Sequence, residues 1–456
     1  MKALHKNILE RLDQIINNTG DHIHDFINNP HAFTRKRTLN AATVLKTTIN
    51  MQGQNLNSEL FKAFGEDATK KNDKVVSTSA YVQRKSQLSP ACFKHILTVF
   101  NQNLFNIQLF DHHYRLFAID GSDFNQIWNP KLNNIVQASS HKKKPYCQIH
   151  VNALYDLLNN TYQDCIFQPK SEMDERKAAV QMLKALNCGP YIVTMDRSYT
   201  SFNMIENCNR LSNCHYIIRT KAGQGEVKEI TTLPDQECDR EISCLVTTSN
   251  YYYITHKASE NIHHVQHHYR QYIKYRSKNT QDLSWDFGEL CTIKFRACKF
   301  RINDAKSGKE EWEVVLTNLD RKNYPLKRIK ELYHLRWGIE TSFKKLKYSL
   351  GSVQFHSKQD KFIEMEIYAH MIMFNAISQI DAQAYIPQKH CKYQYAINFK
   401  QSCLIIQSMY LASSLTQDFE RILIQISYYT IPIRPGRKDK RNIKPKSAVY
   451  YLYRVA

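Results

Sequence analysis

Several features that assign a chain to a common protein class are missing from this sequence. No uninterrupted apolar run reaches the roughly 18 residues that a membrane-spanning helix needs, and neither end carries a basic amphipathic helix. The first residues, Met1 to Leu12, contain no apolar core of the kind found in signal peptides. These absences predict a soluble, non-secreted protein, cytoplasmic in location and without a membrane partner.

Cysteine spacing of a recognisable kind is also missing. The 12 cysteines are scattered and form no C-x-x-C pair. We therefore expect buried free thiols rather than a zinc site or a disulfide framework. The chain shows no internal repeat and no long low-complexity segment.

Acidic residues are outnumbered by basic ones. The chain has 63 Lys and Arg against 42 Asp and Glu, a net charge of +21, and this excess favours a polyanionic partner, either nucleic acid or an acidic membrane surface. The missing membrane features favour nucleic acid. The 456 residues, 42% of them hydrophobic, are enough for two to four domains with real cores. Charge alone does not separate an enzyme from a protein that coats nucleic acid.

The periodicity of apolar residues divides the chain into five predicted parts. Residues 1–106 form short helices whose polar, basic faces suit a helix-turn-helix-like DNA-binding domain, although an ordinary helical bundle fits the pattern equally well. Residues 107–221 follow the order of three strands, helix, strand, helix, strand, which is typical of an α/β core. Residues 222–310 are β-rich, with strands expected at 245–255, 273–276 and 290–301, and form an inserted β-subdomain. Residues 311–385 return to the core with a strand at 312–318 and a long helical stretch, and residues 386–456 form a C-terminal, mainly helical region with a basic tail.

Two aspartates follow apolar strands of the predicted core. Asp120 ends the apolar segment 114–119 and Asp196 ends the segment 191–195. A single acid in such a place is usually a turn or cap residue, but two acids on strands that can pair repel each other unless a cation lies between them. Mg²⁺ prefers such carboxylates and keeps positions open for phosphate oxygens.

A third acid lies in the helical stretch after residue 330. On a helical wheel Tyr333, Arg336, Glu340 and Lys347 share an arc of about 60° beside an apolar stripe. This pattern predicts that Glu340 lies at the rim of a cleft. The alternative, favoured for the helix in isolation, is a solvated face with an Arg336–Glu340 salt bridge. Gly338 weakens the helix interior, which a close approach of another backbone or a local distortion would explain.

The spacing Tyr333-x2-Arg336-x3-Glu340-x6-Lys347 resembles the Tyr-Arg-Glu-Lys signature of bacterial insertion-sequence DDE transposases, the insertion sequence four family. Residues 119–122 are similar to the first-aspartate motif of that family. Residues 196–199 are similar to its second-aspartate motif, apart from a serine at position 198 where the family has glycine. The likeness extends to residues 81–90 and 433–437 and so covers nearly the whole chain.

The resemblance implies an RNase H-like catalytic core with a β insertion between the second aspartate and the glutamate. In this chain 340 − 196 = 144 positions separate the two, which leaves room for the insertion. It also implies that Asp120, Asp196 and Glu340 hold two divalent ions, Mg²⁺ with Mn²⁺ able to substitute, for a cut-and-paste reaction. That reaction proceeds by end nicking, hairpin formation, hairpin opening and strand transfer at terminal inverted repeats and target DNA, within a homodimer.

The same resemblance implies a set of DNA contacts. Arg336 and Lys347 would grip phosphates and Tyr333 would add its hydroxyl to that region. A tryptophan in the insertion would stack on a displaced base, and Trp285 is the candidate, with Trp312 as the alternative. Arg84 and Arg437 are further candidates for DNA contacts.

Two other clusters of residues are more simply interpreted as parts of surface loops without a functional role. Lys142, Lys143 and Lys144 form a basic triplet of the kind usually found in solvated loops. The histidines between 256 and 268 could bind metal, but the surface insertion predicted there makes this the less favoured interpretation. The rival functions are a non-catalytic DNA-binding protein descended from a transposase, a stand-alone metal nuclease, and a basic membrane-surface or scaffold protein. The three ordered acids favour the transposase.

Overall fold

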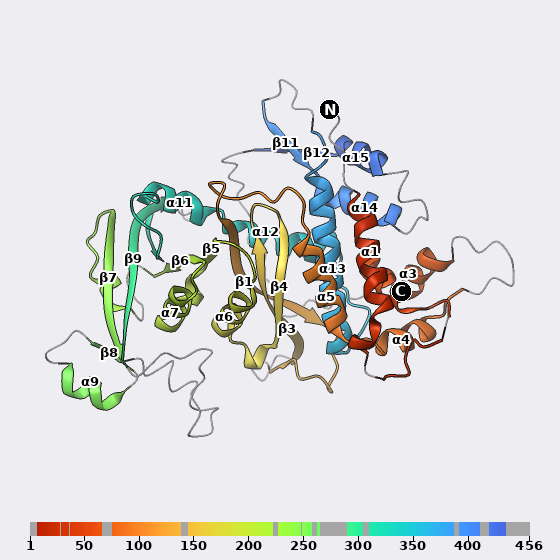
Figure 1. The fold of residues 1–456 in the computed structure, drawn as a ribbon, viewed down its shortest axis with the longest axis horizontal. Helices are drawn as coiled ribbons and strands as arrows, with labels where there is room; N and C mark the ends of the chain where they lie inside the picture. Colours follow the sequence, from red (N-terminus) through yellow and green to blue (C-terminus); the bar gives the residue numbers. More distant parts are fainter. Residues whose placement is uncertain are drawn as a thin grey trace.

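The computed structural model describes most of the chain between residues 7 and 434. The described residues are 7–27, 29–35, 37–65, 75–137, 145–221, 227–247, 249–257, 262–264, 290–303, 310–386, 392–410 and 419–434. They form a mixed α/β structure around one large sheet (Figure 1). This agrees with the predicted α/β class, while the division into five parts stays a prediction.

The central sheet has ten strands. Its order is β2-β3-β1-β5-β6-β10-β9-β7-β8, and β4 also pairs with β3. The strands β1, β3, β4, β5 and β6 confirm the predicted order of three strands, helix, strand, helix, strand. The strand bounds are β1 Arg115–Gln126, β2 Ile135–Val136, β3 Tyr146–Asp156, β4 Thr161–Pro169, β5 Tyr191–Met195, β6 Cys214–Thr220, β7 Cys238–Thr247, β8 Ile262–His264, β9 Leu290–Asn303 and β10 Glu310–Thr317.

Helices cover both faces of this sheet. On one face, α6 (Glu175–Ala185) and α7 (Phe202–Arg210) pack over a cluster that includes Phe117, Val193 and Tyr216. On the other face, α11 (Leu326–His334) packs over the neighbouring positions of the same strands. Helices can pack on both faces because successive side chains along a strand point to opposite faces of the sheet. Strand β5 is buried along its whole length, as its continuous apolar sequence predicts.

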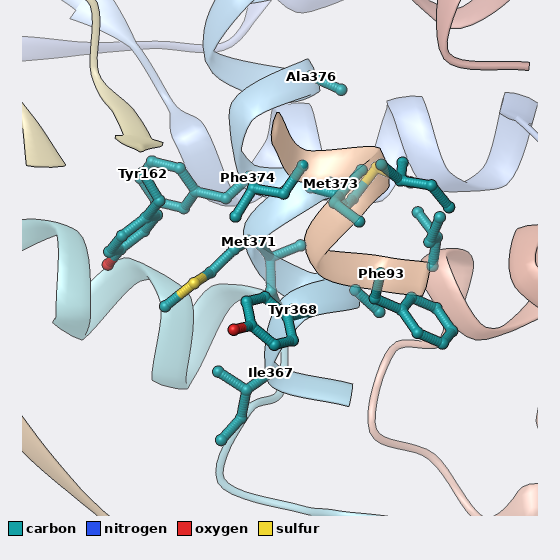
Figure 2. Packing of buried hydrophobic residues seen from close by; sticks show 14 of the residues in the cluster. Phe93, Tyr162, Ile367, Tyr368, Met371, Met373, Phe374 and Ala376 are labelled. Carbon is teal, nitrogen blue, oxygen red and sulfur yellow. The ribbon is translucent and has the colours of Figure 1, made fainter. Parts of the chain in front are cut away.

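Helix α13 (Asp360–Asp381) joins the sheet to the N-terminal helices. It is apolar on nearly all sides and is buried from Met365 to Ile380, as expected of a helix inside a core. Figure 2 shows its side chains Tyr368, Met371 and Phe374 packed beside Phe93 and Tyr162. One hydrophobic cluster therefore spans the sheet, α13 and five N-terminal helices, which are α1 Ile8–Asp21, α2 Ala41–Asn50, α3 Leu56–Phe64, α4 Thr78–Ser86 and α5 Pro90–Gln102.

A buried ionic network links α4 to α13. Lys85 contacts Glu366 at 3.0 Å, and the second oxygen of Glu366 accepts from the backbone N–H of His356 at 2.8 Å. Burial alone would raise the pKa of Glu366, but Lys85 and His356 outweigh it and hold that pKa well below its usual range. The N-terminal helices are thus tied to the core by charge as well as by apolar contact.

The described part of the segment 222–310 continues the central sheet. Strand β9 pairs with β10, β7 with β9, and β8 with β7. The predicted strand at 290–301 is confirmed, but the predicted strand at 245–255 is wrong beyond Thr247. Ser249 caps the helix α9 (Asn250–His256) there by accepting from the N–H of Tyr252. The predicted strand at 273–276 lies outside the described residues.

The C-terminal region contains two helices and a hairpin. These are α14 (Phe399–Tyr410), α15 (Phe419–Tyr428), and the paired strands β11 (Gln394–Ile397) and β12 (Thr430–Ile433). Figure 1 shows them at the end of α13, beside α1. A search of the described helices for a long apolar stretch able to cross a membrane finds none.

Candidate active site

Asp120 and Asp196 lie side by side on neighbouring strands. Strands β1 and β5 are parallel, and their last paired residues are Ile119 and Met195. Asp120 follows Ile119 within β1, and Asp196 directly follows the last residue of β5, so the two aspartates come directly after this last pair. Strand β1 does not end at Asp120, because it continues to Gln126 against β3. Asp120 therefore lies where β1 loses β5 as a partner, rather than at the end of a strand as predicted.

The Asp120 carboxylate lies in surroundings that disfavour its charged form. Burial raises its pKa, Arg336 lowers it, and Asp196 and Glu340 raise it again, with a result of about 7. Its Oδ1 accepts from the N–H of Gly121 at 2.9 Å. The negative charges near it are thus only partly compensated.

Arg336 lies between two of the acids. Its Nη1 is 3.6 Å from Oδ2 of Asp120, and its Nη2 donates to Oε1 of Glu340 at 2.8 Å. The guanidinium is nearly buried, and despite its desolvation the pKa of Arg336 is raised by Tyr333, Asp120 and Glu340. The Arg336–Glu340 salt bridge expected for a solvated face does form, but it forms inside a carboxylate cluster.

The helix that carries Glu340 is interrupted. Helix α11 ends at His334 and α12 (Trp337–Ser349) begins three residues later, with Leu335 and Arg336 in the turn between them. The continuous helix assumed for the wheel is therefore wrong, and Leu335, expected in the apolar stripe, is 42% exposed. A Cβ at Gly338 would lie 2.7 Å from Cδ2 of Leu157, so the close neighbour of this glycine is the end of a flexible side chain and not another backbone.

Tyr333 lies on the far side of that break. Its side chain is 6% exposed, and its hydroxyl finds no hydrogen-bond partner among the described residues. Burial raises the pKa of Tyr333 to about 12. The phenol lies next to Arg336, whose guanidinium carbon is 5.8 Å from the ring centroid.

Lys347 reaches the first-aspartate motif from the last turn of α12. Its Nζ donates to Oγ of Ser122 at 2.8 Å and to the carbonyl of Asp123 at 2.7 Å. The apolar side of α12, with Ile339, Phe343 and Leu346 buried, holds the helix in this position. Burial lowers the pKa of Lys347 to about 8, with Asp123 acting in the opposite direction.

A polar network beside the acids was not foreseen from the sequence. Oγ of Ser198 lies 2.6 Å from Asp196 and 3.0 Å from Glu175, so its single proton can be donated to either carboxylate. His150 then lies between Glu175, at 3.1 Å, and Asp123, at 2.6 Å. Burial lowers the pKa of His150, but Asp123 and Glu175 have the larger effect, so the pKa is raised above its usual value. The network connects the two aspartate motifs.

The lack of a side chain at Gly121 leaves room for His150 and Glu175 in this network. A Cβ at position 121 would lie 2.4 Å from Nε2 of His150 and 2.5 Å from Oε1 of Glu175. Both distances are far below van der Waals contact, so the glycine of the first motif is required by packing. The glycine after Asp120 is a signal in the sequence from which side chains close to that position could have been predicted.

Other predicted contacts are spread over the molecule. Arg84 donates to the carbonyl of Leu39 and to Gln87, within the N-terminal helices. Trp312, on β10, has the cations of Lys299 and Arg301 over its ring. Trp285, Arg437 and the lysines 142–144 lie outside the described residues. No finding tests the assigned roles, which stay predictions.

The three acids suit a hard divalent cation. All three offer carboxylate oxygen, the ligand type that Mg²⁺ prefers. Burial first, and then the nearby Asp196 and Glu340 carboxylates, raise the pKa of Asp120, and a bound divalent cation would offset both effects. The chemistry that this donor set supports is phosphoryl transfer.

Comparison with known proteins agrees with that chemistry. A family model described as a transposase DDE domain matches residues 111–376. Among solved structures, the chain is similar to a cryo-EM structure of the piggyBac transposase synaptic complex with hairpin DNA. The identity is 10% and the TM-score 0.45, over 97% of this chain and 89% of that one. No curated protein matches the chain.

Proposed function

Because the chain belongs to the transposase DDE domain family, we propose that it is a DNA transposase that moves an insertion sequence by cut-and-paste transposition. The observation that supports the proposal is the placement of the three acids: Asp196 directly follows β5, the strand paired with the Asp120 strand β1, and Arg336 contacts both Asp120 and Glu340. The acids come from three separate parts of the chain, which are β1, the end of β5 and α12.

The strand order supports an RNase H-like core. Strands β4, β3, β1, β5 and β6 are neighbours in that order, with β3 antiparallel to its neighbours and β1, β5 and β6 parallel. In this arrangement Asp120 and Asp196 lie where the pairing of β1 with β5 ends, and ligands commonly bind at strand ends of α/β sheets. The β7–β9 region then corresponds to the proposed insertion between Asp196 and Glu340.

Asp120, Asp196 and Glu340 would hold the divalent ions, Mg²⁺ or Mn²⁺. When bound, such ions supply an activated oxygen nucleophile and stabilise the leaving oxygen of an in-line displacement. The protein's own side chains orient the DNA for nicking, hairpin formation and opening, and strand transfer. Arg336 offers a planar fork to a phosphate, and Lys347 a point charge.

Arg336 has a second part in this proposal. Its guanidinium balances Asp120 and Glu340 in this structure, and it would be available to a phosphate of the transposon end if other cations balanced those two acids. Tyr333 lies beside it and contributes its hydroxyl once Arg336 moves. Trp285 remains the candidate for stacking on a displaced base, and a homodimer would bring the two ends together.

The proposal is tested with the purified full chain and duplex DNA carrying the inverted repeats that flank its gene. Asp120→Asn, Asp196→Asn and Glu340→Gln should each lower Mg²⁺-dependent cleavage by at least about a thousandfold while gel-shift binding persists. Glu172→Gln, at an exposed carboxylate, is the matched control and should cleave normally.

Two outcomes would overturn the proposal. Cleavage that survives any one of the three substitutions removes that acid from the site. Specific binding by the wild-type chain without cleavage, in Mg²⁺ or Mn²⁺, identifies instead a DNA-binding descendant of a transposase.

A further inference from the structure

A second group of metal-ligating side chains lies outside the carboxylate site. Glu229, Cys244 and His263 each direct a ligand atom to one point, and these atoms all lie within 4.8 Å of one another. Among the described residues, no other three of this kind meet that closely. We propose that they form a zinc-binding site, a role that does not rest on transposase activity.

Strand pairing explains how the three ligands meet. His263 on β8 is the partner of Val246 on the parallel strand β7, so their side chains share one face of the sheet. Cys244 precedes Val246 by two residues and points to that same face. Helix α8 (Lys228–Thr231) places Glu229 above it, and Nε2 of His263 lies 2.5 Å from Oε1 of Glu229.

The surroundings hold the ligands in place. Cys244 is 1% exposed and His263 7%, and the flanking Val227 and Ile230 are buried as well. The ring of Phe202, on α7, lies 5.5 Å from the ring of His263. A ligand in such a pocket keeps few rotamers, so little side-chain entropy is lost when an ion binds.

The ligand types select zinc rather than magnesium. Thiolate sulfur and imidazole nitrogen are ligands of Zn²⁺, whereas Mg²⁺ takes oxygen. One thiolate, one carboxylate and a neutral imidazole balance the two positive charges of the ion, which a buried site requires. Zinc bonds of about 2.0–2.3 Å need only small rotations from the present contacts.

The thiol is protonated when no ion is bound. Burial, followed by the nearby Glu229 carboxylate, raises the pKa of Cys244 well above its usual range. Zinc would displace this proton to solvent as the sulfur–zinc bond forms. Occupancy should therefore fall as the pH decreases.

Zinc would also fix a short edge strand. Strand β8 has three residues, and its described pairing consists of three residue pairs with β7. So short a strand is weakly held by its backbone alone. An ion joined to His263, Cys244 and Glu229 would tie β8 and α8 to β7.

The experiment measures zinc in the purified full chain after exchange into EDTA-treated, metal-free buffer. We expect about one zinc per chain, and loss of at least about nine-tenths of it in Cys244→Ser and His263→Asn. Cys238→Ser, on the same strand, and His256→Asn are the matched controls and should retain zinc.

Cobalt substitution tests the ligands directly. The cobalt-loaded chain should show a thiolate-to-metal charge-transfer band, present in Cys238→Ser and absent in Cys244→Ser. Hydrogen exchange at residues 262–264 should accelerate when the zinc is removed. The variant Asp120→Asn should keep its zinc, which separates this proposal from the proposed transposase activity.

Three results would overturn the zinc site. The first is wild-type protein without zinc after growth and refolding in zinc-supplemented medium. The second is Cys244→Ser that is folded and still carries zinc with a thiolate band, which would move the site to another cysteine. The third is exchange at 262–264 that does not change on zinc removal, which would leave β8 held by pairing alone.

Discussion

Two buried carboxylates in this protein have opposite electrostatic surroundings. Glu366, between α4 and α13, faces Lys85 at 3.0 Å and His356 at 3.1 Å, and its pKa lies well below the usual range. Asp120, at the strand pair β1–β5, shares one buried arginine with Glu340 and lies near Asp196, and its pKa is about 7. Burial acts in the same direction at both sites. The two sites differ in the number of cationic side chains that face each carboxylate.

The difference separates a structural ion pair from a site prepared for a ligand. At Glu366 the protein supplies enough positive charge, and the network is complete in itself. Around Asp120 the protein supplies less positive charge, which costs stability and would favour the proposed binding of a divalent ion. The same substitution, a carboxylate replaced by its amide, should therefore have opposite effects at the two sites.

The largest expected effect on stability is at the structural pair. Glu366→Gln leaves Lys85 and His356 buried without their anion and should cost about 3–5 kcal/mol of unfolding free energy, measured by urea denaturation. Glu364→Gln, on the same helix, is the control, because burial and Asp360 raise the pKa of Glu364 to about 7 and its charge is not stabilising. A cost under about 1 kcal/mol for Glu366→Gln would contradict the comparison.

The second effect has the opposite sign. Asp120→Asn removes a poorly compensated charge and should raise the unfolding free energy of the metal-free protein at pH 8 by about 1–2 kcal/mol. Asp156→Asn provides the contrast, since Asp156 is buried and receives two contacts from Arg115 at 2.6 and 2.7 Å, and that variant should be destabilised. A destabilised Asp120→Asn would mean that Asp120 is compensated after all.

The third effect is a pH dependence. The pKa of Asp120 in the folded protein, about 7, lies above its ordinary value of 3.8, so the folded state keeps a proton that the unfolded state loses. Stability without divalent ions should fall as the pH rises from about 4 to 7, by at most about 1.4 kcal/mol per pH unit from this group. The difference in slope between wild type and Asp120→Asn isolates it, and saturating Mg²⁺ should abolish that difference. Equal slopes without Mg²⁺ would argue against the raised pKa.

The smallest effect concerns Ser198, where the resembling family has glycine. Ser198→Gly removes hydroxyl contacts to Asp196 and Glu175 but keeps the backbone N–H that Asp196 accepts at 2.7 Å. Stability should change by about 0.5 kcal/mol or less, and cleavage by less than about threefold. A tenfold loss of cleavage would show that the hydroxyl positions Asp196.

The sequence predicted the parts of the site that depend on local pattern. Apolar strand runs located Asp120 and Asp196, and the spacing of Tyr333, Arg336 and Glu340 located the third acid. A helical wheel could not reveal the break at residues 335–336, because it assumes a continuous helix. The contacts of His150 with Asp123 and Glu175 depend on how β1, β3 and α6 pack, and no local pattern encodes that.

The histidine group shows the same limit in another way. The sequence placed His263 in a cluster of histidines between residues 256 and 268. Metal binding was the less favoured interpretation of that cluster, because a surface insertion was predicted there. Pairing of β8 with β7 selects His263 from that cluster and brings it to Cys244, while His256 stacks on Tyr252 instead. Sequence spacing offered no means to choose between them.

The Lys85–Glu366 contact has a consequence for how the protein is made. Its two residues are 281 positions apart in the chain. At translation speeds of roughly 5–20 residues per second, Lys85 is synthesised roughly 15–55 seconds before its partner. During that interval the apolar faces of the first five helices lack α13, the helix against which they pack. Nascent chains stalled before residue 360 should therefore bind chaperones through these helices and leave Lys85 open to acylating reagents, whereas released full-length chains should protect it.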